Sequence, residues 1–449
     1  MEQPLKRLET EDSEARMNDT GYSDVVIVGG GASGLAAAVE LKMSSPDLGV
    51  TVIEKNPETG RKIRATGSGR CNITNRDAEG YTEIMKFFAR IGLVTRTYDN
   101  GLVYPYSESA ADVADLFAVR ADELGVRMIT GAEVTSAGKM ADDVQPGMLR
   151  KGSDMFETSY IVSGPARKTE KTIRSAYLIL ACGGKAGPMF GTTGDGYRLA
   201  RAFGHDIVTP VPVLTSMECT EWAEGSTPSG LTLAGTRTRG TVVLHRQHES
   251  GEPVRLFEET GEIQFTKYGL SGICIFNMTR HMRYDRSAGE SLEIFRVTAD
   301  LFPDGDISAY LRERRENAFA GEKVTEVLRT VLKENIAAYV LCRAESGRGR
   351  RFTGLEVADM TDEDILAVSR CVHSLSFHPD KIRGWKEAQA TSGGVSLEEL
   401  DSVTSESLLV PGLFITGELA DRDFMCGGFN LSNAWLTGLH AAGEISSRR

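Results

Sequence analysis

A glycine-rich turn near the amino terminus constrains the fold of this chain more than any other feature. The run SDVVIV at 23–28 predicts a short β-strand, GGGASG follows at 29–34, and residues 32–42 have the composition of a helix. Gly29, Gly31 and Gly34 thus form GxGxxG between a strand and a helix. In this pattern the glycines permit a tight turn, close approach of backbone N–H groups to a pyrophosphate, and packing of the helix on the strand. With a second strand at 50–54, the segment predicts a Rossmann-type βαβ unit that binds a dinucleotide.

The residue at the end of the second strand narrows the choice of dinucleotide. Glu54 lies twenty residues after Gly34, where a carboxylate can accept hydrogen bonds from both ribose hydroxyls. A carboxylate at this point would repel the 2′-phosphate of NADP. FAD and NAD therefore remain as candidates.

The carboxyl-terminal segment at 412–445 carries a second glycine-rich turn. A strand ends at Thr416, Gly417 and Glu418 form a turn, and Gly427 and Gly428 precede a helix. The apolar residues of this helix lie on one face: Leu431, Ala434, Trp435, Leu439 and Ala442. Its amino terminus could offer free N–H groups to an electron-rich ligand, although an ordinary capped helix fits the same pattern.

Composition and charge exclude several other classes. The formal charge of −12 disfavours binding to nucleic acid or to anionic membranes. The first twenty residues are polar and contain no apolar stretch, so we expect a cytoplasmic protein with a disordered tail at 1–21. The seven cysteines are scattered and never spaced as CxxC, and HExxH does not occur, so we expect no disulfide framework, dithiol centre or metal site.

Taken together, the motifs resemble a known family. The chain from Asp24 to Ile445 is similar to bacterial FAD-dependent oxidoreductases that include aminoacetone-oxidase-like proteins and bile-acid enone reductases, and is distantly similar to fumarate reductase flavoproteins. The matching segments are VIVGGGASGLAAA, EKNPETGRKIRATGSGRCNITN, GTTGDGYRLARAFGH, GEIQFTKYGLSGICIFNMTR, ATSGGVSLEEL and CGGFNLSNAW. The resemblance implies non-covalent FAD, and no histidine lies in the 60–75 loop to attach the flavin.

The resemblance also implies which residues bind the cofactor. The ADP half would contact Gly29, Gly31, Ala32, Ser33, Gly34, Glu54 and Lys55, with Val134 at the adenine and Gly183 and Gly184 at the pyrophosphate. The ribityl chain and flavin would contact Lys62, Arg70, Cys71, Asn72, Gly417, Glu418, Asp421, Gly428, Phe429, Asn430 and Leu431. The family usually has a run like LDVDG after the glutamate, whereas this chain has Leu419, Ala420, Asp421, Arg422, Asp423 and Phe424. Phe424 replaces a small residue there, which puts the local turn in doubt.

Some residues admit two interpretations. Cys71 could be a redox thiol, but a packing role beside the cofactor is the simpler interpretation because no partner cysteine lies nearby in the sequence. Asp195 could be a catalytic base, but a turn or helix-cap carboxylate is the simpler interpretation. His205, His373 and His378 are expected to be structural or exposed.

The expected fold is α/β, with a Rossmann-type FAD-binding domain at 22–208 and 376–449. Residues 209–375 would form an inserted β-rich substrate domain with a helical subdomain at about 303–349. The strand at 176–181 would extend a parallel sheet, and 139–172 is a polar stretch without a predicted element.

The resemblance to the bile-acid reductases implies NAD(P)H-driven reduction of an enone-type double bond in a small organic substrate, with NADH or NADPH binding transiently. The motifs leave the substrate and the oligomeric state open. Tyr268, Lys267 and Arg280 are the first candidates for a proton donor, although packing or solvent exposure is the simpler role for each. Two alternatives remain: an FAD-dependent amine oxidase that produces hydrogen peroxide, and a flavin-binding regulatory protein without turnover.

Overall fold

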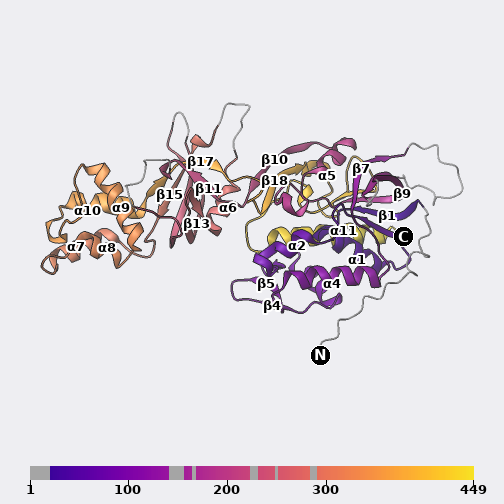
Figure 1. The fold of residues 1–449 in the computed structure, drawn as a ribbon, viewed down its shortest axis with the longest axis horizontal. Helices are drawn as coiled ribbons and strands as arrows, with labels where there is room; N and C mark the ends of the chain where they lie inside the picture. Colours follow the sequence, from indigo (N-terminus) through magenta and orange to yellow (C-terminus); the bar gives the residue numbers. More distant parts are fainter. Residues whose placement is uncertain are drawn as a thin grey trace.

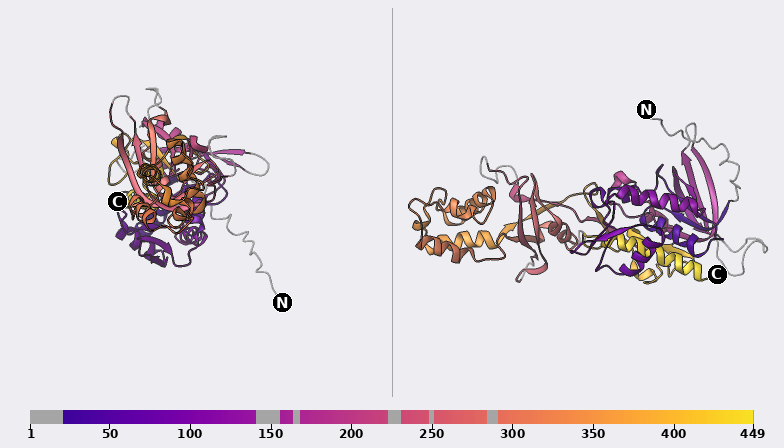
Figure 2. Two further views of the ribbon diagram at one scale, coloured as in Figure 1. Left: turned by 90° about the vertical axis from the view of Figure 1, so that its left-hand side faces the viewer. Right: turned by 90° about the horizontal axis from the view of Figure 1, so that it is seen from below.

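The computed structural model describes residues 21–140, 156–163, 168–222, 231–247, 251–283 and 291–448. The expected tail at 1–21 lies outside these ranges except for Gly21. The molecule is elongated: a mixed α/β half contains the first and last described residues, an antiparallel sheet lies in the middle, and a group of helices forms the far end (Figures 1 and 2).

A seven-stranded sheet forms the core of the first half. Its strands run in the order β6 (Arg127–Ile129), β2 (Val50–Ile53), β1 (Tyr22–Val28), β9 (Lys168–Leu180), β8 (Phe156–Ser163) and β7 (Ala132–Lys139), and β19 (Leu413–Ile415) also pairs with β9. Strands β6, β2, β1, β9 and β19 are parallel, which confirms the predicted Rossmann-type sheet. Their carboxyl ends meet at one edge, where dinucleotides bind in such folds.

The sequence predicts a strand pair around 126–134, which β6 and the first residues of β7 confirm, but it predicts no element for β8 or for the first half of β9. β7, β8 and the first half of β9 form a meander, with Phe156 opposite Ser175 and Val134 opposite Tyr160. These strands occupy part of the polar stretch at 139–172, to which the sequence assigned no element. The sheet is therefore mixed rather than purely parallel.

Two helices from opposite ends of the chain cover one face of the sheet. α1 (Ala32–Ser44) follows β1, and α11 (Phe429–Ser447) packs along it (Figure 1). A Cβ atom added to Gly438 would lie 2.4 Å from the Ser33 carbonyl oxygen, so the two helices approach closely only because this residue is glycine. Trp435 is fully buried and stacks on Phe117 of α4 (Ala110–Glu123).

Shorter elements complete this half. They are α2 (Arg61–Ala65), α3 (Tyr81–Arg90), α5 (Asp195–Ala202) and a small sheet of β3 (Thr74–Asn75), β5 (Leu102–Pro105) and β4 (Thr95–Thr97). The helices predicted at 81–91 and 110–124 are confirmed by α3 and α4.

The middle of the molecule is a second, antiparallel sheet. Its order is β16 (Leu375–Phe377), β15 (Phe295–Asp300), β12 (Arg237–Arg246), β13 (Val254–Phe265), β14 (Gly269–Ser271), β11 (Met217–Cys219) and β17 (Pro379–Ile382). The short helix α6 (Ile273–Thr279) follows β14. Because β16 and β17 belong to this sheet, the chain leaves it after 382, a few residues beyond the expected boundary at 376.

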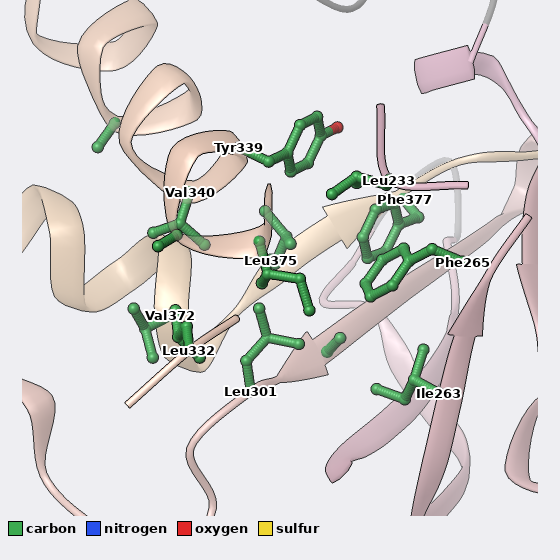
Figure 3. Close-up of a cluster of buried hydrophobic side chains, with 14 of the residues drawn as sticks. Leu233, Ile263, Phe265, Leu301, Leu332, Tyr339, Val340, Val372, Leu375 and Phe377 are labelled. Carbon is green, nitrogen blue, oxygen red and sulfur yellow. The ribbon is translucent and has the colours of Figure 1, made fainter. Parts of the chain in front are cut away.

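Helices pack against one face of this sheet. They are α7 (Ile307–Glu316), α8 (Val324–Arg329), α9 (Glu334–Arg348) and α10 (Asp362–His373), and α10 confirms the helix that the sequence predicts at 361–375. Tyr339 and Val340 of α9 and Val372 of α10 face Phe265 and Phe377 of the sheet in one buried cluster (Figure 3).

Two chain segments connect the halves. β10 (Ile207–Val213) leads into the antiparallel sheet, and β18 (Ala390–Val395) returns from it; the two strands pair antiparallel. Between them, the Gln389 N–H donates to the Leu214 carbonyl oxygen at 3.2 Å, and Arg383 N–H donates to the Ser216 carbonyl oxygen at 3.0 Å. The junction is therefore narrow and formed by paired backbone.

Candidate active site

The three motif glycines have different structural roles. A Cβ atom on Gly29 would lie 2.4 Å from the Ala181 carbonyl oxygen, and one on Gly34 would lie 2.0 Å from the Gly29 carbonyl oxygen. A Cβ atom on Gly31, in contrast, meets no atom of the chain within 4 Å. Gly31 is also the N-cap of α1, and no side chain caps this helix end. Close backbone packing thus explains why positions 29 and 34 are glycine. Gly31 instead borders open space at the uncapped amino terminus of α1, where backbone N–H groups could bind a pyrophosphate.

Glu54 lies where an adenosine ribose would bind. Its residue is 8% exposed, and its carboxylate accepts hydrogen bonds from Gly30 N–H at 2.8 Å and Asn56 N–H at 2.8 Å. The Asn56 side-chain amide also donates to the same oxygen as Asn56 N–H, at 2.6 Å. These bonds fix the carboxylate beside the glycine turn and leave a lone pair for a hydroxyl donor on the oxygen that faces Gly30.

We expect Glu54→Ala to weaken FAD binding by about 1–3 kcal/mol, the range for losing hydrogen bonds to a charged group. Glu54→Gln is the matched control, because it keeps one acceptor oxygen beside the Gly30 N–H. Titration of apoprotein with FAD measures both. Equal affinity in wild type and Glu54→Ala would exclude a ribose contact.

The Lys55 side chain is bound by Asp195 and its neighbour Thr193. Its ammonium forms an ion pair with the Asp195 carboxylate and hydrogen-bonds to the Thr193 hydroxyl at 2.7 Å. Asp195 is the first residue of α5, after the N-cap Gly194. The structure therefore places the GTTGDG turn directly beside the predicted ADP site.

The loop at 66–72 has an unusual backbone. Ser68 and Cys71 have positive φ angles of 56° and 57°, in a region that non-glycine residues seldom adopt. Cys71 is fully buried, and burial raises the pKa of its thiol to about 11. The thiol is therefore protonated at neutral pH, and all seven cysteines are free, as a packing role for Cys71 requires.

Two further residues of this loop adjoin the small sheet. The Arg70 guanidinium lies 5.0 Å from the centre of the Tyr104 ring and 3.9 Å from the Glu108 carboxylate. The Asn72 side-chain oxygen accepts a hydrogen bond from Val103 N–H at 3.3 Å. The small sheet thereby supports the loop.

Segments far apart in the sequence meet at Glu418. Its carboxylate accepts a hydrogen bond from the Lys62 ammonium at 2.8 Å and from Thr391 N–H at 2.8 Å. A Cβ atom on Gly184 would lie 2.7 Å from the same carboxylate, and one on Gly417 would lie 2.9 Å from the Ser33 hydroxyl. Five predicted site residues are thus brought together.

The turn before α11 is held by Asn430. Its side chain accepts a hydrogen bond from Phe424 N–H at 3.0 Å and donates to the Phe424 carbonyl oxygen at 2.9 Å. Phe424 does not have a positive φ, so the loss of the family's small residue causes no backbone strain here. Asp421 accepts a hydrogen bond from Gly393 N–H at 2.7 Å, which joins the turn to β18.

The remaining predicted residues surround the same edge. A Cβ atom on Gly428 would lie 2.7 Å from the Thr74 carbonyl group, so α11 begins against β3. Phe429 and Leu431 are partly buried in its first turn. Gly183 has a positive φ of 69° at the end of β9, and the Val134 carbonyl oxygen accepts a hydrogen bond from Arg198 at 3.2 Å.

Tyr197, two residues after Asp195, has no role in the sequence-based predictions. The residue is 4% exposed, and its buried hydroxyl has no hydrogen-bond partner among the described residues. Burial, followed by the charges of Glu418 and Asp421, raises the pKa of this hydroxyl. A buried hydroxyl beside two site carboxylates suits a polar ligand that supplies its missing partner.

The three proton-donor candidates do not meet at one point. Arg280 donates from Nε to the Asp423 carboxylate at 2.6 Å and from Nη2 to the Asp423 carbonyl oxygen at 2.7 Å. The Tyr268 hydroxyl hydrogen-bonds to the Ser216 hydroxyl at 3.1 Å, and Lys267 is exposed. Arg280 alone of the three contacts the loop that leads to Gly428.

The histidines have structural partners. His205 is buried between the Glu399 carboxylate and the Ser407 hydroxyl, and both hydrogen bonds are 2.8 Å long. Ser407 is itself only 4% exposed, and its hydroxyl accepts a hydrogen bond from a backbone N–H group, so these contacts are structural. His373 pairs with Asp300, and His378 pairs with Glu221. Within the described ranges no group of His, Cys, Asp and Glu is arranged to hold a metal ion. None of the described helices is both long and apolar enough to span a membrane.

Comparisons with known proteins identify the family of this chain. The HI0933-like protein Rossmann domain family matches residues 23–82 and 80–444. The 3-dehydro-bile acid delta(4,6)-reductase of Clostridium scindens is 32% identical over 446 residues, covering 94% of this chain and 98% of the relative. The ribosomal RNA dihydrouridine synthase of Haemophilus influenzae is 24% identical, covering 95% and 99%.

Among solved structures, a 3-ketosteroid-delta4-(5alpha)-dehydrogenase from Rhodococcus jostii matches with a TM-score of 0.45 and 13% identity, covering 95% of this chain and 97% of that one. The family match spans nearly the whole chain, and the glycine turn, Glu54 and the space at Gly31 fit the cofactor. The chain belongs to the HI0933-like Rossmann family and is an FAD-dependent oxidoreductase.

Proposed function

We propose that the protein uses NADH or NADPH to reduce an enone-type double bond in a small organic substrate. The observation that supports this most is the 32% identity, over almost the whole of both chains, to a relative named as a bile-acid reductase. The names of the dihydrouridine synthases also denote reduction of a carbon–carbon double bond. We further propose that the enzyme acts in the cytoplasm, without a membrane or nucleic-acid partner.

When bound, FAD supplies hydride transfer, and the chain supplies binding, orientation and exclusion of water. Gly31, Glu54, Lys62 and Glu418 would hold the cofactor at the carboxyl edge of the parallel sheet. Cys426 lies just before Gly427 and Gly428, and burial raises the pKa of its thiol to about 12. This thiol therefore adds no negative charge beside the site at neutral pH.

The arginines where α6 meets the loop at 423–426 are paired with aspartates. Arg280 is paired with Asp423, and Arg283 lies 3.2 Å from Asp423 and 3.8 Å from Asp421. A neutral enone suits such a site better than an RNA strand, whose phosphates require unpaired cations.

Anaerobic mixing tests the proposal. We expect NADH or NADPH to bleach the flavin absorbance band, and an enone added afterwards to restore it with formation of the saturated ketone. Ping-pong kinetics should follow, because the transient nicotinamide must leave the cavity before the acceptor enters.

Three other results would replace the proposal. Bleaching by a primary amine only, with recovery in oxygen and release of peroxide, identifies an amine oxidase. Recovery with uridine-containing RNA but not with enones identifies an RNA-modifying enzyme. A flavin that no dinucleotide or amine reduces indicates a binding protein.

A further inference from the structure

Helix α6 presents one face to the FAD-binding half of the molecule. Residues spaced by three and four positions share a face of a helix, which places Ile273, Phe276, Asn277 and Arg280 together. The other residues of α6, such as Cys274, Ile275 and Met278, are fully buried in the core of the antiparallel sheet.

Three of the four residues on this face have partners across the junction. Phe276 packs against the small cluster of Val213, Leu214 and Ala390, as does Cys426. The Asn277 side-chain oxygen accepts a hydrogen bond from Cys426 N–H at 2.7 Å, and Arg280 pairs with Asp423. Ile273, the fourth, is 61% exposed.

The two pairings define a direction. Arg280 lies opposite Asp423 and Asn277 lies opposite Cys426, so α6 and the loop at 423–426 run antiparallel. One helical turn from Asn277 toward the amino terminus of α6 lies Ile273. Because the two segments are antiparallel, the corresponding step along the loop leads from Cys426 to Gly427 and Gly428. Ile273 therefore continues the α6 contact face toward the turn that precedes α11.

Apolar side chains gather around that turn. Met425, in the loop itself, is 42% exposed. A Cβ atom on Gly427 would lie 3.4 Å from the Phe429 ring and 3.6 Å from Leu102. Exposed apolar side chains beside a site are typical of surfaces that bind an apolar ligand.

We infer that Ile273 and Met425, the exposed apolar residues of α6 and of the loop opposite it, form an apolar wall that binds the hydrocarbon skeleton of the substrate and sets its size preference. The inference rests on the proposed enone reduction and adds the residues that select among enones. A large polycyclic enone would bury the Ile273 side chain, whereas a single-ring enone would bind without reaching it.

Binding to the oxidised holoenzyme tests this inference independently of turnover, because ligands beside a flavin perturb its absorbance. The probes are a steroidal enone and cyclohexenone, and the variants are Ile273→Ser and Ile273→Leu. Leu408→Ser is the matched control, because Leu408 is also 61% exposed but lies in the loop between β18 and β19. All four proteins should retain FAD.

We expect Ile273→Ser to weaken binding of the steroidal enone about tenfold or more, as loss of a buried isoleucine side chain does. Cyclohexenone binding should change by less than about twofold, and Ile273→Leu and Leu408→Ser should behave as wild type. An equal effect of Ile273→Ser on both ligands, or none on either, overturns the inference. If wild type binds the steroidal enone through Ile273 but never reduces it, the proposed function fails while the apolar wall stands.

Discussion

The Gly31→Val variant is expected to fold but to lose its FAD. Among the described residues no atom lies within 4 Å of a Cβ added at Gly31, so we expect a valine side chain to enter open space, where the pyrophosphate would bind. Overpacking costs about 1–3 kcal/mol, and each lost hydrogen bond to a charged group costs about 1.5–3 kcal/mol. We therefore expect FAD affinity to fall about a hundredfold or more, measured by FAD titration of apoprotein.

Gly34→Val is the informative contrast to this variant. Its Cβ would lie 2.0 Å from the Gly29 carbonyl oxygen, so the substitution disrupts the contact between α1 and β1 itself. We expect Gly34→Val to lower the melting temperature of the apoprotein strongly and Gly31→Val to leave it nearly unchanged. Full FAD occupancy in purified Gly31→Val would show that the space at Gly31 does not hold the cofactor.

Local patterns made the Rossmann unit predictable, whereas the first half of β9 was missed. The glycine turn, both strands and Glu54 lie within about thirty residues and follow buried, β-branched runs. The first half of β9, in contrast, is mostly exposed or half-buried, and its sequence KTEKTIR is charged. A strand with two solvated faces lacks the alternation of apolar and polar residues that identifies strands in a sequence.

The candidate site shows the same distinction. Lys62, Gly184 and Glu418 were predicted because each lies in a glycine-rich segment that resembles the family, and the parallel sheet brings these segments to one edge. The pairing of Arg280 with Asp423 joins residues 143 positions apart and depends on how α6 docks. No local pattern encodes such a contact, and the same holds for the unpartnered hydroxyl of Tyr197.

The second large effect is expected for Asp423→Ala. The Asp423 side chain is 8% exposed and accepts hydrogen bonds from Arg280 at 2.6 Å, Arg283 at 3.2 Å and Ser392 at 2.8 Å. Removing it leaves the Arg280 guanidinium, which is 22% exposed, without its main partner. Breaking a buried pair costs about 3–5 kcal/mol, and we expect about 2–3 kcal/mol here because water reaches Arg280. Urea unfolding of the holoprotein, followed by FAD release, measures this loss.

A double variant separates the ion pair from simple packing. Asp423→Ala leaves a charge without its counterion, whereas the combination of Arg280→Met and Asp423→Leu removes both charges and keeps apolar volume. If the charge pair holds α6 against the loop at 423–426, the double variant should be more stable than Asp423→Ala by about 1 kcal/mol or more. The cycle completed with the single variants Arg280→Met and Asp423→Leu should give a coupling energy of similar size. Strictly additive losses would mean that Arg280 and Asp423 stabilise the junction independently, and that the pairing does not position the turn before α11.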